Sequence, residues 1–299
     1  MRSDAAIMVG VLGGTVDRMV LGWAAEEAVA RHAGLLVCHV RERGEPSPRT
    51  GEPEPAGSAE LLVREAANTA HSRFPDLAIA TAVGHDRVAA TLIQASADAR
   101  MLVLGAHTHA DTHTHTDDGA DGGAGGGADR GGGLRLGSVA EQVAANAHCP
   151  VAVIRAPSAP DLTDVVVGVD GSSHSELTLR SAAAEARRFG GRLIVIHAYR
   201  LPAPAEYGPN AGVDEPHHRA AAEALLEQTL DQLQPDHDTL KIEPRAIHAG
   251  ATPALLDAAT TAAVIVVGAH GTGSRTPLRI GSVSHHLLRH APCPVLIAR

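Results

Sequence analysis

Short apolar runs alternate along the chain with longer segments whose apolar residues recur every three or four positions. In the C-terminal half the apolar runs predict buried strands at 164–169, 192–198, 241–247, 263–268 and 294–298. The Ala-rich segments between them predict amphipathic helices at 174–189, 216–233, 252–261 and 282–290. Ser173 and Glu176 have the spacing of a capping box at the start of the first helix. This alternation predicts an α/β fold with a parallel sheet and helices on both of its faces.

The N-terminal half repeats the same pattern. Ile7-Met8-Val9-Gly10-Val11 matches residues 165–169 at an offset of 158, and residues 101–107 match residues 264–270 at an offset of 163. Further on, Gly137-Ser138-Val139 matches Gly281-Ser282-Val283 at an offset of only 144. The fall from 163 to 144 places an insertion of 19 residues in the first copy, between Gly105 and Gly137. We therefore predict two repeated domains, 1–155 and 164–299, with a linker at 156–163 and an insertion at about 108–132.

A glycine-rich loop follows the strand predicted at 263–268. Gly268, Gly271 and then Gly281-Ser282 are spaced G-x2-G-x9-G-S, and a predicted helix begins directly after them. The amides of such a loop and of the first helical turn point at one spot, where the helix dipole favours an anion. No Lys precedes Ser282, so the spacing is not that of a Walker A loop.

This stretch resembles the ATP-binding signature of the universal stress protein family. Gly281-Ser282-Val283, followed by Ala291-Pro292-Cys293-Pro294-Val295-Leu296, is similar to that family almost residue for residue, and the resemblance covers nearly the whole chain, twice. It implies two Rossmann-like domains, each a five-stranded parallel sheet in the order 3-2-1-4-5. It also implies that the two copies pack about a pseudo-twofold axis through strands 151–155 and 294–298, and that the chain forms a homodimer.

The resemblance implies an ATP site in the second copy, with Mg²⁺ as a possible companion. Asp170, which follows Gly168 and Val169, is expected to contact the ribose or adenine, although an Asx turn that starts a helix is the alternative interpretation. The main chain of Ala198 is expected to meet the adenine. The phosphates are expected beside Gly268, His270, Gly271, Gly281, Ser282, Val283 and Ser284, where His270 is equally compatible with a solvent-facing loop position.

The first copy departs from this pattern. Leu12 stands where the second copy has Asp170, Thr108 stands where it has Gly271, and the insertion interrupts the loop. Gly105, Gly137 and Ser138 remain, so we predict a degenerate site and one nucleotide per chain, bound in the second copy. The alternative is that the inserted glycines 131–133 rebuild a cradle for phosphate.

The insertion is rich in His, Asp and Gly. Imidazoles and carboxylates in such a loop are potential ligands for Zn²⁺ or Ni²⁺, and here they are His107, His109, Asp111, His113, His115, Asp117 and Asp118. A solvated loop with adventitious metal affinity is the simpler interpretation, and no metal site is assigned.

Composition narrows the function classes. A net charge of −9 with 2% aromatic residues argues against nucleic acid as a partner, and no apolar run approaches the roughly 18 residues of a membrane helix. Three cysteines suit a reducing cytoplasm, with Cys149 and Cys293 as small core residues. We predict a cytoplasmic ATP-binding protein that regulates an unknown protein partner in a stress response, without catalytic residues. The alternatives are a slow Mg²⁺-dependent ATPase or phosphotransferase, and metal binding through the His-rich loop.

Overall fold

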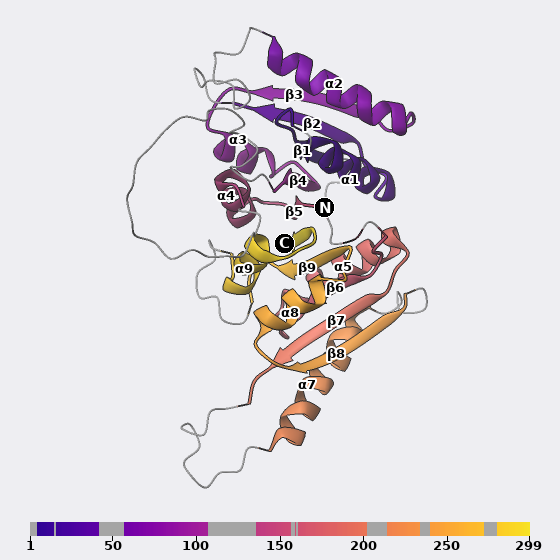
Figure 1. Ribbon diagram of the computed structural model, residues 1–299, viewed down its shortest axis with the longest axis vertical. Coiled ribbons are helices and arrows are strands. Elements are labelled where there is room, and N and C mark those ends of the chain that lie inside the picture. Colours follow the sequence, from indigo (N-terminus) through magenta and orange to yellow (C-terminus); the bar gives the residue numbers. More distant parts are fainter. Residues whose placement is uncertain are drawn as a thin grey trace, which may run out of the picture.

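The two halves of the chain form one ten-stranded sheet with helices on both faces (Figure 1). The computed structural model describes residues 5–14, 16–41, 57–106, 136–156, 159, 161–201, 214–233, 240–271 and 280–299. The strands are β1 (Ile7–Gly10), β2 (Leu35–Val40), β3 (Ile79–Gly84), β4 (Met101–Gly105), β5 (Val151–Ile154), β6 (Val165–Gly168), β7 (Leu193–Tyr199), β8 (Ile242–His248), β9 (Val264–Gly268) and β10 (Val295–Ala298). The helices are α1 (Val16–Ala30), α2 (Ser58–Arg73), α3 (Val88–Ala95), α4 (Ser138–Asn146), α5 (Ser175–Phe189), α7 (Glu215–Leu230), the 3₁₀ turn η2 (Asp231–Leu233), α8 (Ala251–Ala259) and α9 (Ser282–His290).

The strand order is the same in both halves. It runs β3-β2-β1-β4-β5 in the first half and β8-β7-β6-β9-β10 in the second, and every pair within a half is parallel. The predicted α/β class and the order 3-2-1-4-5 are therefore confirmed. The order reverses beside β1 and β6, and ligands of open parallel sheets bind at such a switch point, beyond the carboxyl ends of the strands.

The halves join through their last strands, β5 and β10, which pair antiparallel at the centre of the sheet. Leu296 lies opposite Ala152, its equivalent in the first copy, so the register has local twofold symmetry. Two equivalent arginines reinforce the joint. Arg155 donates from Nη1 to the carbonyl oxygen of Ala291 (2.7 Å), after α9, and Arg299 donates to that of Ala147 (2.5 Å), after α4. Each arginine thus satisfies carbonyl groups at a helix C-terminus of the other half.

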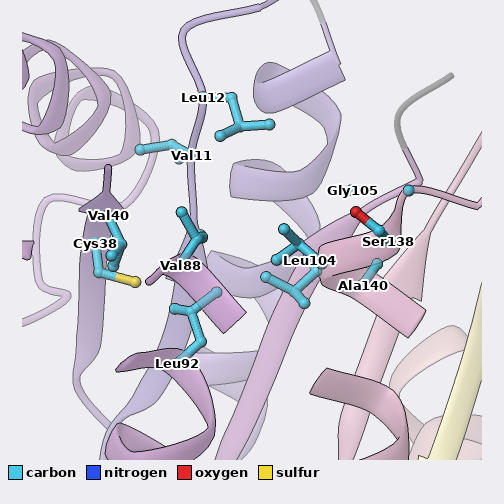
Figure 2. A pocket seen from close by; sticks show the side chains of 13 residues that line it. Val11, Leu12, Cys38, Val40, Val88, Leu92, Leu104, Gly105, Ser138 and Ala140 are labelled. Atoms are coloured by element: carbon cyan, nitrogen blue, oxygen red, sulfur yellow. The ribbon is translucent and has the colours of Figure 1, made fainter. Parts of the chain in front are cut away.

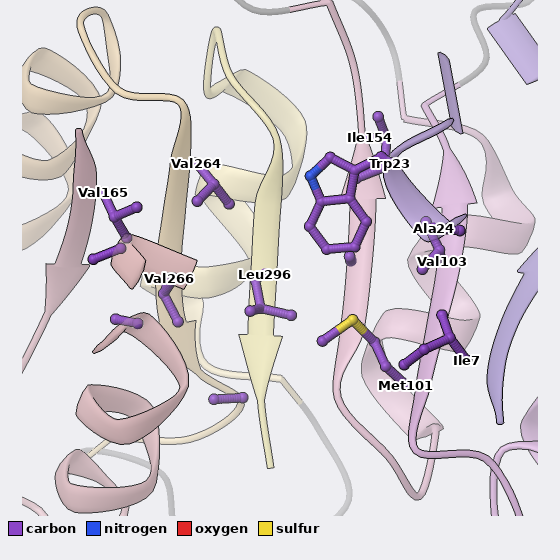
Figure 3. Close-up of a cluster of buried hydrophobic side chains, with 14 of the residues drawn as sticks. Ile7, Trp23, Ala24, Met101, Val103, Ile154, Val165, Val264, Val266 and Leu296 are labelled. Atoms are coloured by element: carbon purple, nitrogen blue, oxygen red, sulfur yellow. The ribbon is translucent and has the colours of Figure 1, made fainter. Parts of the chain in front are cut away.

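Two apolar clusters cover the two faces of the sheet. Successive strand residues point to opposite faces, so Ile7 and Val9 of β1 belong to one cluster and Met8 to the other. Trp23 of α1 and Leu296 of β10 lie in the first cluster, which continues across the joint between the halves (Figure 3). The other cluster holds Cys149 and Cys293, whose prediction as core residues is confirmed.

A buried ion cluster also joins the halves, between α1 and α5. Glu27 and Glu185, at equivalent positions of the two copies, are both fully buried. Arg188 lies 3.0 Å from a carboxylate oxygen of each glutamate, and Arg31 donates to Glu185 at 2.9 Å. Burial and the charge of Glu27 raise the pKa of Glu185 to about 7, against the opposing effect of Arg188 and Arg31.

The predicted capping box at the start of α5 is wrong. The N-cap residue is His174, and no side chain caps the helix. The preceding turn is organised by Asp170 instead, whose Oδ1 accepts from the amide of Ser172 (3.0 Å) and the hydroxyl of Ser175 (3.2 Å). An Asx turn therefore starts the helix one residue later than a cap at Ser173 would. Among the helices of the described ranges, none is long and apolar enough to cross a membrane.

Candidate functional site

A cavity of about 620 Å³ opens at the carboxyl ends of β6, β7 and β9, bordered by the first turn of α9. Its volume lies within the range of about 300–1,000 Å³ that is usual for small-molecule sites. The structure brings every residue predicted from the sequence into its wall: Gly168, Val169, Asp170, Ala198, Gly268, His270, Gly271, Gly281, Ser282, Val283 and Ser284. These residues come from four separate stretches of the chain, and the sheet topology gathers them at one edge.

Asp170 makes the Asx turn and also lines the cavity, so the two interpretations of this residue are compatible. Its second carboxylate oxygen, Oδ2, lies beside the glycine loop. A Cβ atom added at Gly271 would lie 2.5 Å from this oxygen. Only a residue without a side chain can approach the carboxylate this closely. Gly271 and Asp170 are therefore matched to each other.

The end of β7 forms the second wall. His197 lies with Nδ1 3.0 Å from the carbonyl oxygen of Val169, which fixes the turn after β6. His39 makes the same contact with Val11 in the first copy, at 2.8 Å. This histidine pair is thus a structural feature of the repeat, while the neighbouring Ala198 lines the cavity of the second copy.

The first turn of α9 forms the third wall. Gly281 is the N-cap residue, no side chain caps the helix, and its first turn carries no acidic residue. The amides of Ser282, Val283 and Ser284 have no partner within the helix, as at every helix start. Two other donors are engaged within the protein, since the Gly281 amide donates to the carbonyl of Ala269 and the Ser284 hydroxyl to that of Gly268, both at 2.7 Å. The helix start, rather than these two groups, is left to meet an anion.

The described wall contains no Lys or Arg. Its ionisable side chains are Asp170, His174, His197 and His270. The rings of His174 and His270 lie 6.1 Å apart, so His270 belongs to the wall rather than to a solvent-facing loop. A negative ligand group would be met mainly by backbone amides and the dipole of α9.

The apolar part of the cavity was not predicted from the sequence. Ile196 of β7 and Val267 of β9 face Leu255 of α8 around its inner end, and Ala251 begins that helix. Ile196 could have been predicted, because side chains two positions apart along a strand point to the same face and Ala198 was already assigned to the site. No comparable signal linked α8 to the site.

Several predictions concern residues outside the described ranges. The His-rich insertion, Thr108, the glycines 131–133 and the centre of the glycine loop, 272–279, all lie there. Within the described ranges, no group of three or more His, Cys, Asp or Glu side chains is placed to hold a metal ion.

The first copy has a smaller cavity, of about 240 Å³, at the equivalent place (Figure 2). Gly105, Gly137 and Ser138 lie in its wall, as the repeat predicts. Most of the remaining wall is aliphatic, and consists of Val11, Leu12, Val40, Val88, Leu92, Leu104, Val139 and Ala140, with Cys38 and Gly10.

Comparison with known proteins shows a match to one protein family. The profile of the Universal stress protein family matches residues 5–155 and 162–299. The chain is 29% identical to Universal stress protein Rv2005c of Mycobacterium tuberculosis, over 100% of this chain and 98% of that protein. A universal stress protein from Archaeoglobus fulgidus has the same fold over 100% of this chain and 99% of its own, with a TM-score of 0.62 and 16% identity. Another from that organism, solved in complex with dAMP, is 23% identical over 47% of this chain and 100% of its own, with a TM-score of 0.35.

Proposed function

The chain belongs to the universal stress protein family as a tandem of two copies, and from that premise we propose that its second copy is a regulatory nucleotide-binding module with ATP as its ligand. One observation carries the proposal. The cavity of about 620 Å³ brings the Asp170 carboxylate, the glycine loop and the start of α9 into one space at the switch point of the sheet.

The walls of the cavity match the parts of a nucleoside phosphate. Ile196, Val267 and Leu255 provide an apolar slot for a flat base, and the carboxylate of Asp170 can accept hydrogen bonds from ribose hydroxyls or an adenine amine. The start of α9 suits the phosphates. Asp170 is the one acidic side chain of the described wall, so a Mg²⁺ ion would be held chiefly by the phosphates and water.

We propose regulation rather than catalysis, because the wall hydroxyl that meets a carboxylate, that of Ser175 on Asp170, is held in the turn at the start of α5. Binding of ATP would then control the association of a cytoplasmic homodimer with a protein partner. Single-turnover hydrolysis of bound ATP distinguishes this from a slow ATPase. Release of phosphate at a rate that a Ser282→Ala change abolishes would favour the enzyme.

We expect one ATP per chain, bound in the second copy. Asp170→Ala should lower the affinity for ATP by tenfold or more, because a ribose or adenine group that loses its hydrogen-bond partner costs about 1–3 kcal/mol of binding free energy. Titration calorimetry measures both the stoichiometry and the affinity. The exposed Asp257 of α8 lies outside the cavity wall, so Asp257→Ala is the matched control. Two comparable sites per chain, or an Asp170→Ala chain that binds as the wild type does, would contradict the assignment.

Substitution of the loop glycines should also lower the affinity for ATP by about tenfold or more, since a methyl group keeps the phosphate from the backbone amides. Gly281→Ala is the cleaner variant, because its Cβ would meet Ala269 O at 3.6 Å, an ordinary contact. Gly271→Ala would in addition displace the Asp170 carboxylate. Gly137→Ala, at the equivalent N-cap of α4, is the matched control and should leave ATP binding unchanged. Equal affinities of the Gly281→Ala and Gly137→Ala chains would remove the phosphate assignment.

A further inference from the structure

The cavity of the first copy has the architecture of the candidate nucleotide site but a different wall. At four equivalent positions a polar or small residue of the second copy is replaced by an apolar one in the first, and the two members of each pair line their respective cavities. The replacements are Leu12 for Asp170, Val40 for Ala198, Val88 for Ala251 and Ala140 for Ser284. The first three replacements put a larger side chain at the nucleoside end of the cavity, and the first of them also removes a charge. The larger side chains fit the fall in cavity volume from about 620 to about 240 Å³.

The described wall of the first cavity offers a charged ligand mainly the Ser138 hydroxyl and the start of α4, whose first turn carries the acidic Glu141. The one ionisable side chain of this wall is Cys38, which donates to the Val9 carbonyl at 3.2 Å and whose pKa burial raises to about 12. The nearby carboxylate of Asp17 is turned to the loop after β1, where it accepts from the amides of Leu12 (2.8 Å) and Gly14 (3.2 Å). In the second copy the equivalent residue is the neutral Ser175, and the carboxylate is that of Asp170 in the cavity wall.

The size and the mouth of the cavity indicate what fits. An apolar cavity of about 150 Å³ in an engineered protein takes up benzene, so in proportion 240 Å³ has room for about nine or ten non-hydrogen atoms. Figure 2 shows Cys38, Val40, Val88, Leu92 and Leu104 gathered around one space, with Leu12 above them. The side chain of Leu12 lines the cavity and is 42% exposed, so an apolar side chain lies between the interior and solvent.

We propose that the first copy binds an uncharged, apolar small molecule in this cavity, an aliphatic chain of about eight carbons or a ring system of similar volume. Such a ligand removes its own apolar surface and that of the wall from water, which is the main source of affinity in an aliphatic pocket. A nucleotide finds neither the room nor the acceptor there. The tandem chain thus carries two different sites on one scaffold, a polar one and an apolar one.

The test is a calorimetric titration of the full chain with octan-1-ol, which has nine non-hydrogen atoms. We expect saturable binding at one site per chain. Leu12→Asp should weaken it by at least tenfold, because the ligand would pass and partly desolvate a carboxylate at the mouth. Leu177→Asp is the matched control, since Leu177 of α5 is also 42% exposed and lies outside both cavity walls. It should leave the affinity for octan-1-ol unchanged.

A second variant, Ala140→Phe, tests the interior. Ala140 lines the cavity, and a phenyl ring there would occupy the space of the ligand, so binding of octan-1-ol should be lost while ATP binding persists. Thermal unfolding of each variant shows whether it is folded. The proposal is overturned if octan-1-ol does not saturate, or if Leu12→Asp weakens it no more than Leu177→Asp does. It is also overturned if ATP displaces octan-1-ol from the Asp170→Ala chain, because the first cavity would then take a nucleotide.

Discussion

Leu296→Asp is expected to prevent stable folding of the whole chain. Leu296 is fully buried at the centre of the sheet, between Val266 on β9 and Ala152 on β5. Loss of its apolar burial costs about 1.5–3 kcal/mol, and an unpaired charge inside the cluster costs about 3–5 kcal/mol more. Together these approach the whole free energy of unfolding of a typical domain, about 5–15 kcal/mol. Urea unfolding followed by circular dichroism should show a large fall in the transition midpoint, or no folded baseline.

The matched control for this experiment is Leu61→Asp. Leu61 lies on α2 and is 55% exposed, so the same change of side chain should move the midpoint only slightly. A Leu296→Asp chain that unfolds at the same urea concentration as Leu61→Asp would show that the two halves do not depend on the β5–β10 pair.

The stability of the chain is expected to fall by up to about 3 kcal/mol as the pH rises from 5 to 8 because of Glu185 alone. The pKa of this carboxyl is raised from 4.5 to about 7 in the folded chain, so between these values the folded state holds a proton that the unfolded state has released. Stability therefore decreases with pH across that window. Glu185→Gln keeps the shape of the protonated side chain and should flatten this part of the profile, which makes the variant more stable than the wild type at pH 8.

Urea unfolding at several pH values measures the free energy of unfolding of wild type and variant. The difference between the two values at each pH removes the contribution of the ionisable groups that both chains share. Glu176→Gln is the matched control, because Glu176 is an exposed glutamate on the same helix, α5. Its profile should follow that of the wild type. Parallel profiles of wild type and Glu185→Gln would mean that Glu185 does not hold a proton near neutral pH.

The fold could be predicted from the sequence because two independent signals agree. Strand runs such as 264–267 are apolar throughout, as expected for strands covered on both faces, and the repeat shows the same series twice. The resemblance implied that the halves meet through β5 and β10, but the side-chain contacts between the halves could not be predicted in the same way. Arg155 and Arg299 are charged residues at the ends of the last strands, and their spacing does not indicate that each donates to a carbonyl group of a helix in the other half.

The candidate site was predictable where glycine spacing and strand ends mark it, as at Gly268, Gly271 and Asp170. Hydrogen bonding within the site was not, because the partners of the Gly281 amide and the Ser284 hydroxyl are main-chain carbonyls, which leave no trace in residue identity. Leu255 was missed for another reason. Its place in the cavity depends on how α8 crosses the sheet, and an amphipathic pattern reports only that one side of a helix is apolar.

The antiparallel pair at the centre of the sheet also bears on synthesis of the chain. β5 begins at Val151, but its partner β10 begins only at Val295, 144 residues later (295 − 151). At about 5–20 residues per second, a ribosome needs roughly 7–29 seconds to cover that distance. Throughout this interval the nascent first half displays Val151-Ala152-Val153-Ile154 as an unpaired apolar edge, the kind of edge that recruits strands from other chains. Neighbouring nascent chains on one messenger RNA are therefore the setting in which this protein is most exposed to mispairing, and a chaperone that shields β5 until Val295 emerges would raise the yield of correctly joined halves.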